Sequence, residues 1–355
     1  MPYLAIDSVR PGQYLGHTLY GETGNVLLRK GVQLNESFIS KLATRGYRSL
    51  YVFENLEDEV EISDIVSSRV RNNAVTLLRR TFDNIAEEKP PHTWADSIQR
   101  MDQLAQQILT DLEHSETLKA DLINLKCVNE YTLEHSINVG VMSGYVGLHA
   151  GLNMKQVRDV IKAGIYHDIG KTFVENSILN KPASLTDQEM VEIRKHPENG
   201  FKLLMNQLNI SPIIGIGSYL HHERWDGTGY PNGMRGEQIH LYGRIVAVID
   251  VFDAMTSDRL YHRARSNCEV LEYINSKSGI CFDPELVGIL NDKVYPYPTG
   301  SLVRLKNGFV AVVLTNSPEK PDRPIVRITG PQKYRGEVYN LANEPSEIQI
   351  TTSAI

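Results

Sequence analysis

The chain has 355 residues, of which 41% are hydrophobic and 23% are charged, and its formal net charge is −6. This composition is typical of a soluble globular protein with room for two or three domains, and it argues against global disorder. The acidic balance also argues against duplex DNA or an anionic membrane as the main partner. A small anionic ligand remains compatible with it, because such a ligand needs only a local basic pocket or a metal.

The cysteines and the N-terminal residues indicate a compartment. Cys127, Cys268 and Cys281 lie far apart and form no CxxC pair, which favours inert thiols in a reducing cytoplasm over a disulfide framework or a thiolate zinc site. The first residues, MPYLAIDSVR, lack the pattern of a signal peptide. The longest apolar stretch, residues 245–252, is too short to span a bilayer. We therefore expect a cytoplasmic protein with no membrane span.

The first third of the chain divides into two regions. Residues 1–60 combine short alternating segments, turns and one helical stretch, ESFISKLATRG, which predicts a small α+β domain with a regulatory or sensory role. Residues 61–120 are polar and helical, and Lys89-Pro90-Pro91 interrupts them, which predicts a connector of helices. These connector helices are candidates for a homodimer interface, and a plain packed connector is the alternative.

Residues 121–290 are predicted to be almost wholly helical. The segment VRDVIKAGIYHD places Val157, Val160 and Ile161 on one helix face. The segment TDQEMVEIRKH opens with Thr186 and Glu189 at the spacing of a capping box. These patterns predict a helical domain, the largest of the chain.

Residues 291–355 have the pattern of strands. Pro296 and Pro298 end the helices, and two alternating segments then flank Asn307-Gly308, a dipeptide typical of hairpin turns. The sequence therefore predicts a mainly α protein with a small N-terminal α+β domain and a short C-terminal β appendage.

Residue types that bind metals recur on successive helices of the helical region. Apolar residues at helical spacing place His135 on a core face, and a polar side chain on a buried face is costly without a partner. The candidate ligands are His135, His167, Asp168, His196, His221, His222 and Asp250. One site shared by all of them is the economical explanation, and histidine together with carboxylate suits iron, manganese or zinc.

The alternative for each residue alone is an ordinary role in the core. A single histidine on an apolar face is more often a satisfied core residue than a ligand. Five histidines and two aspartates in one helical region favour a shared metal site over seven separate roles in the core. An aspartate beside a histidine can bridge two metals, and two-metal sites activate water and hold a phosphate.

Three motifs carry a family resemblance. They are HDIGK at residues 167–171, HHERWDGTGYP at residues 221–231 and VIDVFDAMTSDRLYHRA at residues 248–264. The region from about 121 to 290 resembles the HD-GYP domain, the subgroup of the HD phosphohydrolase superfamily that hydrolyses the bacterial second messenger cyclic di-GMP. The resemblance implies a mostly helical fold, an iron or manganese cluster, and cleavage to the linear dinucleotide pGpG or to GMP.

The resemblance also implies roles for single residues. All seven candidate ligands fall on the family's ligand positions, with Asp168 as the bridging carboxylate. Lys171 falls where the family has a lysine near the attacked phosphate, and Arg259 where it has an arginine on the other side of the substrate. Tyr230 belongs to the loop beside the site and is, like Lys171, Arg259 and His262, a candidate for contact with the substrate. His262 stands where a lysine is common, and a protonated histidine can still donate to phosphate.

One departure bears on the number of metals. Some members of the family place a glutamate one helical turn before the first histidine, where it helps to hold a third metal. Tyr131 stands there in this chain. We therefore expect two metal ions, iron or manganese, rather than three.

The loop that follows His221 and His222 is expected to be tight. Gly227 and Gly229 permit a tight loop with positive φ or close backbone approach, and an ordinary surface turn is the alternative. Glu223 is expected to orient a histidine from behind or to cap the helix.

The expected activity is metal-dependent hydrolysis of the phosphodiester bonds of cyclic di-GMP by a hydroxide held between two metals, regulated by the N-terminal domain. Lys171 and Arg259 would stabilise the negative charge of the transition state. One alternative is a cyclic dinucleotide receptor or scaffold with little or no turnover. Another is an HD-type phosphohydrolase that acts on a mononucleotide or on another cyclic dinucleotide.

Overall fold

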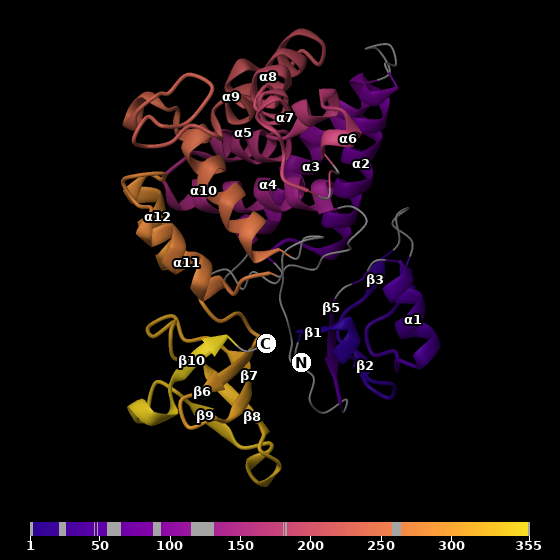
Figure 1. The fold of residues 1–355 in the computed structure, drawn as a ribbon, viewed down its shortest axis with the longest axis vertical. Helices are drawn as coiled ribbons and strands as arrows, with labels where there is room; N and C mark the ends of the chain where they lie inside the picture. The colour runs from indigo at the N-terminus through magenta and orange to yellow at the C-terminus, as the bar shows by residue number, and fades with distance from the viewer. Residues whose placement is uncertain are drawn as a thin grey trace.

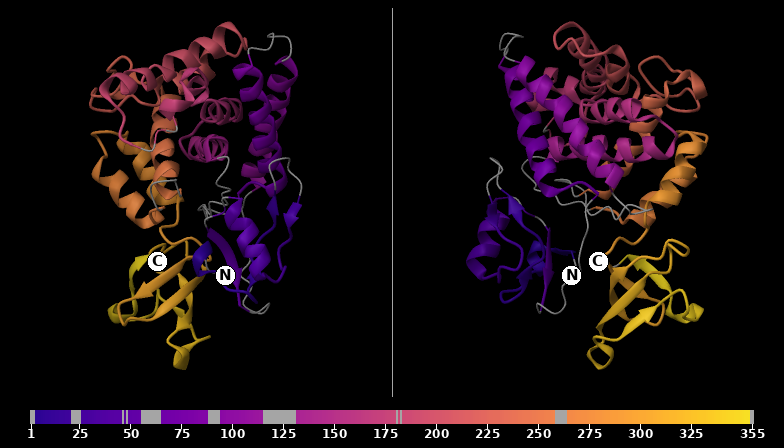
Figure 2. Two further views of the ribbon diagram at one scale, coloured as in Figure 1. Left: turned by 45° about the vertical axis from the view of Figure 1, so that its right-hand side comes forward. Right: turned by 180° about the vertical axis from the view of Figure 1, so that it is seen from behind.

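A computed structural model describes most of the chain. The described residues are 3–20, 26–45, 47, 49–54, 65–87, 94–114, 131–179, 181, 183–257 and 264–353. A helical body lies above two smaller lobes that contain the strands, one formed by the N-terminal residues and one by the C-terminal residues (Figures 1 and 2). Each of the three parts has its own cluster of buried hydrophobic residues. The predicted fold class, mainly α with two small strand-containing parts, is confirmed.

In its described residues the N-terminal lobe contains one α-helix and five short strands. They are β1 (Tyr3–Ala5), β2 (Tyr14–Leu15), β3 (Leu19–Tyr20), β4 (Val26–Leu28), α1 (Glu36–Thr44) and β5 (Ser49–Phe53). β5 lies between β1 and β2 in an antiparallel sheet, and β3 pairs with β4. Asn35 caps α1 by accepting a hydrogen bond from the Phe38 amide, and Leu42 turns inward to the buried Leu15 and Leu50.

The helical body is built from eleven α-helices in the described residues. They are α2 (Ser68–Ala86), α3 (Ala95–His114), α4 (Tyr131–His149), α5 (Met154–Ile165), α6 (Asn176–Leu179), α7 (Asp187–Ile193), α8 (His196–Asn206), α9 (Pro212–Leu220), α10 (Leu241–Thr256), α11 (Asn267–Ser276) and α12 (Pro284–Lys293). The described 3-10 helices of this body are η5 (Ile169–Phe173) and η6 (Gly236–Gln238), whereas η1 (Ile6–Ser8) lies in the N-terminal lobe and η7 (Gln332–Tyr334) and η8 (Ser346–Ile348) in the C-terminal lobe. The predicted capping box at Thr186 and Glu189 is present at the start of α7.

Glycines set the distance between the two central helices. A Cβ built on Gly164 of α5 would lie 2.8 Å from the Cα atom of Gly140 on α4. Real Cβ atoms do not approach that closely, so the two helices pack at this distance only because both positions are glycine. This contact brings His135, on α4, and His167, just after α5, to a ring-centroid distance of 5.1 Å.

Helices α2 and α3 pack onto the same core as the central helices. Leu78 of α2 and Ile108 of α3 belong to one cluster with Ile161 of α5. Lys162 of α5 is buried and forms an ion pair with Asp102 of α3, with 2.6 Å between Nζ and Oδ1. The two helices therefore form part of the body's hydrophobic core.

The C-terminal lobe is a five-stranded antiparallel sheet in the order β10-β6-β7-β8-β9. The strands are β6 (Leu302–Leu305), β7 (Val310–Thr315), β8 (Ile325–Gly330), β9 (Val338–Asn340) and β10 (Ile350–Ser353). Asn307-Gly308 joins β6 to β7, and Gly308 has φ of +86°, as the hairpin prediction requires. Arg335 of this lobe donates to Glu54, which follows β5 of the N-terminal lobe.

None of the helices in the described part of the chain is both long and apolar enough to cross a bilayer. Cys268 and Cys281 are free thiols, and Cys127 lies outside the described residues.

Candidate metal centre

The predicted ligands come from different helices and meet in the interior of the helical body. His135 lies on α4, His196 begins α8 and Asp250 lies on α10. His167 and Asp168 follow α5, and His221 and His222 follow α9. The side chains form three overlapping groups whose ligand atoms lie within 4.8 Å of one another: His196, His221 and His222; His135, His167 and Asp250; and His167, Asp168 and His221. The structure therefore brings together all seven.

Three of the histidines share one pattern of hydrogen bonding. In each, Nδ1 lies 2.7 Å from the backbone carbonyl oxygen three residues earlier in the chain. The pairs are His167 with Gly164, His196 with Ile193, and His221 with Ser218. A carbonyl oxygen can only accept a hydrogen bond, so Nδ1 holds the ring proton and Nε2 presents a lone pair to the common centre.

His135 is oriented by a carboxylate in place of a carbonyl. Its Nδ1 lies 2.7 Å from Oδ2 of Asp253, and its Nε2 lies 3.0 Å from Oδ1 of Asp250. Burial alone would lower the pKa of His135, but the two carboxylates outweigh burial and raise the pKa to about 9. The sequence analysis missed Asp253, although it follows Asp250 by three residues on an apolar helix and so shares its face.

Asp168 lies between the two groups of histidines. Its Oδ2 is 3.2 Å from Nε2 of His167, whereas its Oδ1 is 3.4 Å from Nε2 of His196 and 3.9 Å from Nε2 of His221. Lys171 places Nζ 2.6 Å from Oδ2. Burial opposes ionisation of Asp168, but His167 and Lys171 together hold the pKa of its carboxyl well below the usual value. The two oxygens of this carboxylate therefore face different nitrogen atoms: Oδ2 faces His167 and Lys171, and Oδ1 faces His196 and His221.

The donor set fits a cation. The Nε2 atoms of His196 and His221 face each other at 3.1 Å. Nε2 of His167 is buried without a hydrogen-bond partner among the described residues. Burial lowers the pKa of His196 to about 4 and the pKa of His221 well below its usual value. Both rings are therefore neutral near pH 7, and no proton lies between their two Nε2 atoms. Imidazole nitrogens and carboxylates in this arrangement are the ligands that iron, manganese and zinc take in proteins.

The loop after His222 is tight and is fastened from inside. Gly227 has φ of +81°, and a Cβ on Gly229 would lie 2.4 Å from the backbone nitrogen of Arg224. Both predicted reasons for glycine, positive φ and close approach, are therefore confirmed. Glu223 is buried and accepts hydrogen bonds from the Asn232 and Met234 amides at 2.7 and 3.0 Å. The prediction that Glu223 orients a histidine or caps the helix is wrong, because this carboxylate holds the loop.

Comparison with known proteins identifies the family of the chain. The HD domain family model matches residues 80–286. The chain belongs to the HD domain family. It is similar to a cyclic di-GMP phosphodiesterase of Pseudomonas aeruginosa, with 36% identity over 73% of this chain and 60% of the relative. It is also similar to a cyclic di-GMP phosphodiesterase response regulator of Xanthomonas campestris, with 41% identity over 42% of this chain and 40% of the relative. A cyclic di-GMP phosphodiesterase of Thermotoga maritima is 35% identical over 53% of this chain and 52% of its own length. The chain thus spans 60% or less of the length of each of these relatives.

The remaining predicted residues of the HD domain are only partly described. Lys171 lies beside Asp168, and Tyr230 lies beside His222. Arg259 and His262 lie outside the described residues, and so does the side chain of Tyr131, although the backbone of Tyr131 begins α4.

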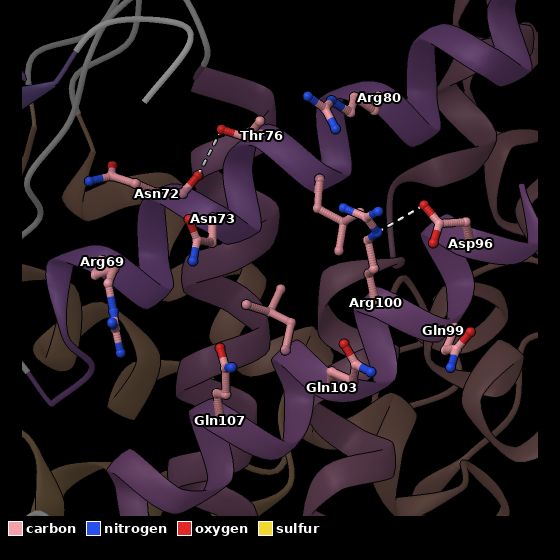
Figure 3. Close-up of a pocket in the computed structure, with 12 residues that line it drawn as sticks. Arg69, Asn72, Asn73, Thr76, Arg80, Asp96, Gln99, Arg100, Gln103 and Gln107 are labelled. Carbon is pink, nitrogen blue, oxygen red and sulfur yellow. Dashed lines mark hydrogen bonds and ion pairs between the residues drawn. The ribbon is translucent and has the colours of Figure 1, made fainter. Parts of the chain in front are cut away.

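A groove on the helical body lies between α2 and α3, with a volume of about 900 Å³ (Figure 3). Its lining is polar and includes Arg69, Arg80 and Arg100. Asp96 is the one carboxylate among the lining residues, and it is paired with Arg100 at 2.8 Å. Since no histidine lines this groove, it offers no comparable set of metal ligands, and the histidine cluster is the stronger candidate for chemistry.

Proposed function

We propose that this HD domain protein hydrolyses the phosphodiester bonds of cyclic di-GMP in a metal-dependent reaction. The observation that carries the proposal is the position of Asp168, whose two oxygens face two different groups of histidine Nε2 atoms. This is the arrangement that a carboxylate bridging two metals requires. The printed names of the relatives supply the substrate.

We propose two metal ions, iron or manganese. His135, His167 and Asp250 would hold one of them together with Asp168. The other would be held by His196, His221 and His222, again with Asp168. Bound there, the metals would lower the pKa of water enough to supply hydroxide near neutral pH and would neutralise the charge of the phosphate.

The chain's own residues would complete the site. Lys171 is about one-third exposed, so its ammonium group can contact both the carboxylate of Asp168 and a phosphate oxygen. There it would stabilise the negative charge that develops in the transition state. Arg259 and His262 would contact the substrate from another side, on the family resemblance alone.

The products and the regulation belong to the same proposal. Cleavage of one phosphodiester bond gives linear pGpG, and cleavage of both gives GMP. The N-terminal lobe, with a hydrophobic cluster of its own, would regulate the helical body in the cytoplasm. Helices α2 and α3 are the proposed homodimer contact.

The test measures activity and metal on one sample. The full chain is purified anaerobically, its iron and manganese are counted, and hydrolysis of cyclic di-GMP is followed beside a panel of other cyclic dinucleotides and mononucleotides. We expect turnover of cyclic di-GMP with about two metals per chain, and loss of both metal and turnover in Asp168→Ala. A fully metallated protein that binds cyclic di-GMP without turnover would support the receptor instead. Faster hydrolysis of another nucleotide would reassign the substrate.

A further inference from the structure

His222 is held differently from the other histidines of the cluster. Nδ1 of His167, His196 and His221 donates to a backbone carbonyl, and Nδ1 of His135 pairs with a carboxylate. None of the hydrogen bonds in the described part of the chain involves the ring of His222. A ligand whose second nitrogen has no acceptor must be oriented by packing.

Besides its neighbours in the histidine cluster, His221 and His196, the ring that packs on His222 among the described residues is that of Tyr230. The two rings stack with their centroids 4.7 Å apart and their planes 23° from parallel. The backbone N–H of Tyr230 also donates to the carbonyl oxygen of His222 at 3.1 Å. This hydrogen bond therefore ties the backbone of Tyr230 to the backbone of His222, the residue on whose ring it stacks.

Two further residues hold Tyr230 in place. Glu223 closes the loop from inside through the Asn232 and Met234 amides. The guanidinium carbon of Arg194 lies 5.3 Å from the centroid of the Tyr230 ring, and Arg194 precedes the ligand His196 by two residues. Tyr230 thus connects the segment that carries His222 to the segment that carries His196.

We infer that Tyr230 is a positioning residue whose ring orients His222 toward the metal group, with Arg194 as a weaker support. This assigns Tyr230 a task in addition to the contact with the substrate that the family resemblance implies. The inference rests on the proposed metal site and deepens it. Because the Tyr230 ring would hold His222 in the orientation that binds metal, its loss should lower the metal affinity even when no substrate is present.

The test compares Tyr230→Leu, which removes the ring, with Tyr230→Phe, which keeps it. Metal-free full-length protein is titrated with Co²⁺ against a chromophoric chelator, and the visible absorption of bound Co²⁺ is recorded. We expect Tyr230→Leu to bind its weaker Co²⁺ about 10- to 100-fold less tightly, with an altered spectrum. Tyr230→Phe should keep the wild-type affinity and spectrum. Wild-type behaviour of Tyr230→Leu, or equal losses in both variants, would overturn the inference.

A double-mutant cycle shows whether Tyr230 acts through His222. In a His222→Ala background, Tyr230→Leu should cause no further loss of Co²⁺ affinity. A further tenfold loss would contradict the inference. If Tyr230→Leu does not fold, Arg194→Gln replaces it, because Arg194 is exposed and its removal should weaken Co²⁺ binding about two- to fivefold. Unchanged affinity in Arg194→Gln would then count against the inference.

These measurements use no substrate. A wild-type protein that binds two Co²⁺ ions but does not hydrolyse cyclic di-GMP would defeat the proposed function and leave the inference on Tyr230 standing. Normal turnover with normal Co²⁺ binding in Tyr230→Leu would do the reverse.

Discussion

The Nε2 atoms of His196 and His221 face each other at 3.1 Å, and both rings hold their proton on the far nitrogen. Two lone pairs at this distance repel unless a positive charge lies between them. Both rings are almost fully buried, so water does not screen the repulsion. A cation bound at this point would relieve the repulsion, and the stability of the protein should then depend on it.

Removal of the metal should destabilise the helical body. A metal that binds only the folded protein at 100 times its Kd contributes about 2.7 kcal/mol. For a region of this size, that corresponds to a fall in Tm of about 5–10 °C. Differential scanning calorimetry before and after chelation, with Mn²⁺ added back, measures the change. Mg²⁺ serves as the control, because it prefers oxygen ligands and should not restore the Tm. An identical Tm with and without Mn²⁺ would contradict the assignment of the histidines.

Asp253 should support the metal through His135, the ligand that it orients. Its carboxylate accepts from Nδ1 of His135, and Asp253→Ala removes the acceptor and frees the ring to turn. We expect metal affinity to fall about 10- to 100-fold, the usual cost of losing the partner of a ligating histidine. Competition against a chelator measures this change. Asp292→Asn, on the exposed face of α12, is the matched control and should leave the affinity unchanged.

The ligands could be predicted from the sequence because each one lies within a local pattern. HDIGK and HHERWDGTGYP mark four of them without any knowledge of tertiary contacts. Helical periodicity placed His135 on a core face, and the structure buries it there. The fold class could be predicted for the same reason, because long amphipathic helices and the Asn307-Gly308 turn are patterns of neighbouring residues.

The residues that support the ligands were not predictable in the same way. Asp253 has the correct helical spacing, but its partner depends on how α10 packs against α4, which no local pattern states. The partners of Glu223 are backbone amides nine and eleven residues later, and they meet it only after the loop has closed. The contact of Arg194 with Tyr230 joins two motifs that are separate in the sequence. Contacts of this kind come from tertiary packing and override local propensity.

Loss of Glu223 should open the loop without unfolding the helices. Glu223→Ala leaves the Asn232 and Met234 amides without their buried acceptor, at a cost of about 1–3 kcal/mol for each amide that water does not reach. We expect backbone amides of residues 229–235 to exchange faster with deuterium, while those of α5 keep their protection. Hydrogen exchange followed by mass spectrometry of the two peptides measures both. Glu237→Ala, on the exposed part of the same loop, is the control and should change neither peptide. Equal protection in Glu223→Ala and wild type would show that other contacts hold the loop.

The close approach of η5 to α8 should make Gly170 the least replaceable glycine near the site. A Cβ there would lie 1.9 Å from the carbonyl oxygen of His196 and 2.5 Å from the amide nitrogen of Gly200, and backbone cannot move aside as a flexible side chain can. Gly170→Ala should therefore push η5, which follows Asp168, away from the start of α8, and it should lower the free energy of unfolding by about 3 kcal/mol.

The same substitution at Gly288 is the matched control for Gly170→Ala. Gly288 lies within α12, and a Cβ there meets no other atom within 4 Å. Gly288→Ala should therefore stabilise the protein by up to about 1 kcal/mol, because alanine favours a helix interior and glycine does not. Urea unfolding of the two variants, followed by far-UV circular dichroism, tests the pair. If the two substitutions change the midpoint by the same amount and in the same direction, steric contact with α8 is not what makes Gly170 necessary. If only Gly170→Ala loses stability, the close packing of η5 on α8 is what holds the segment that follows Asp168 in place.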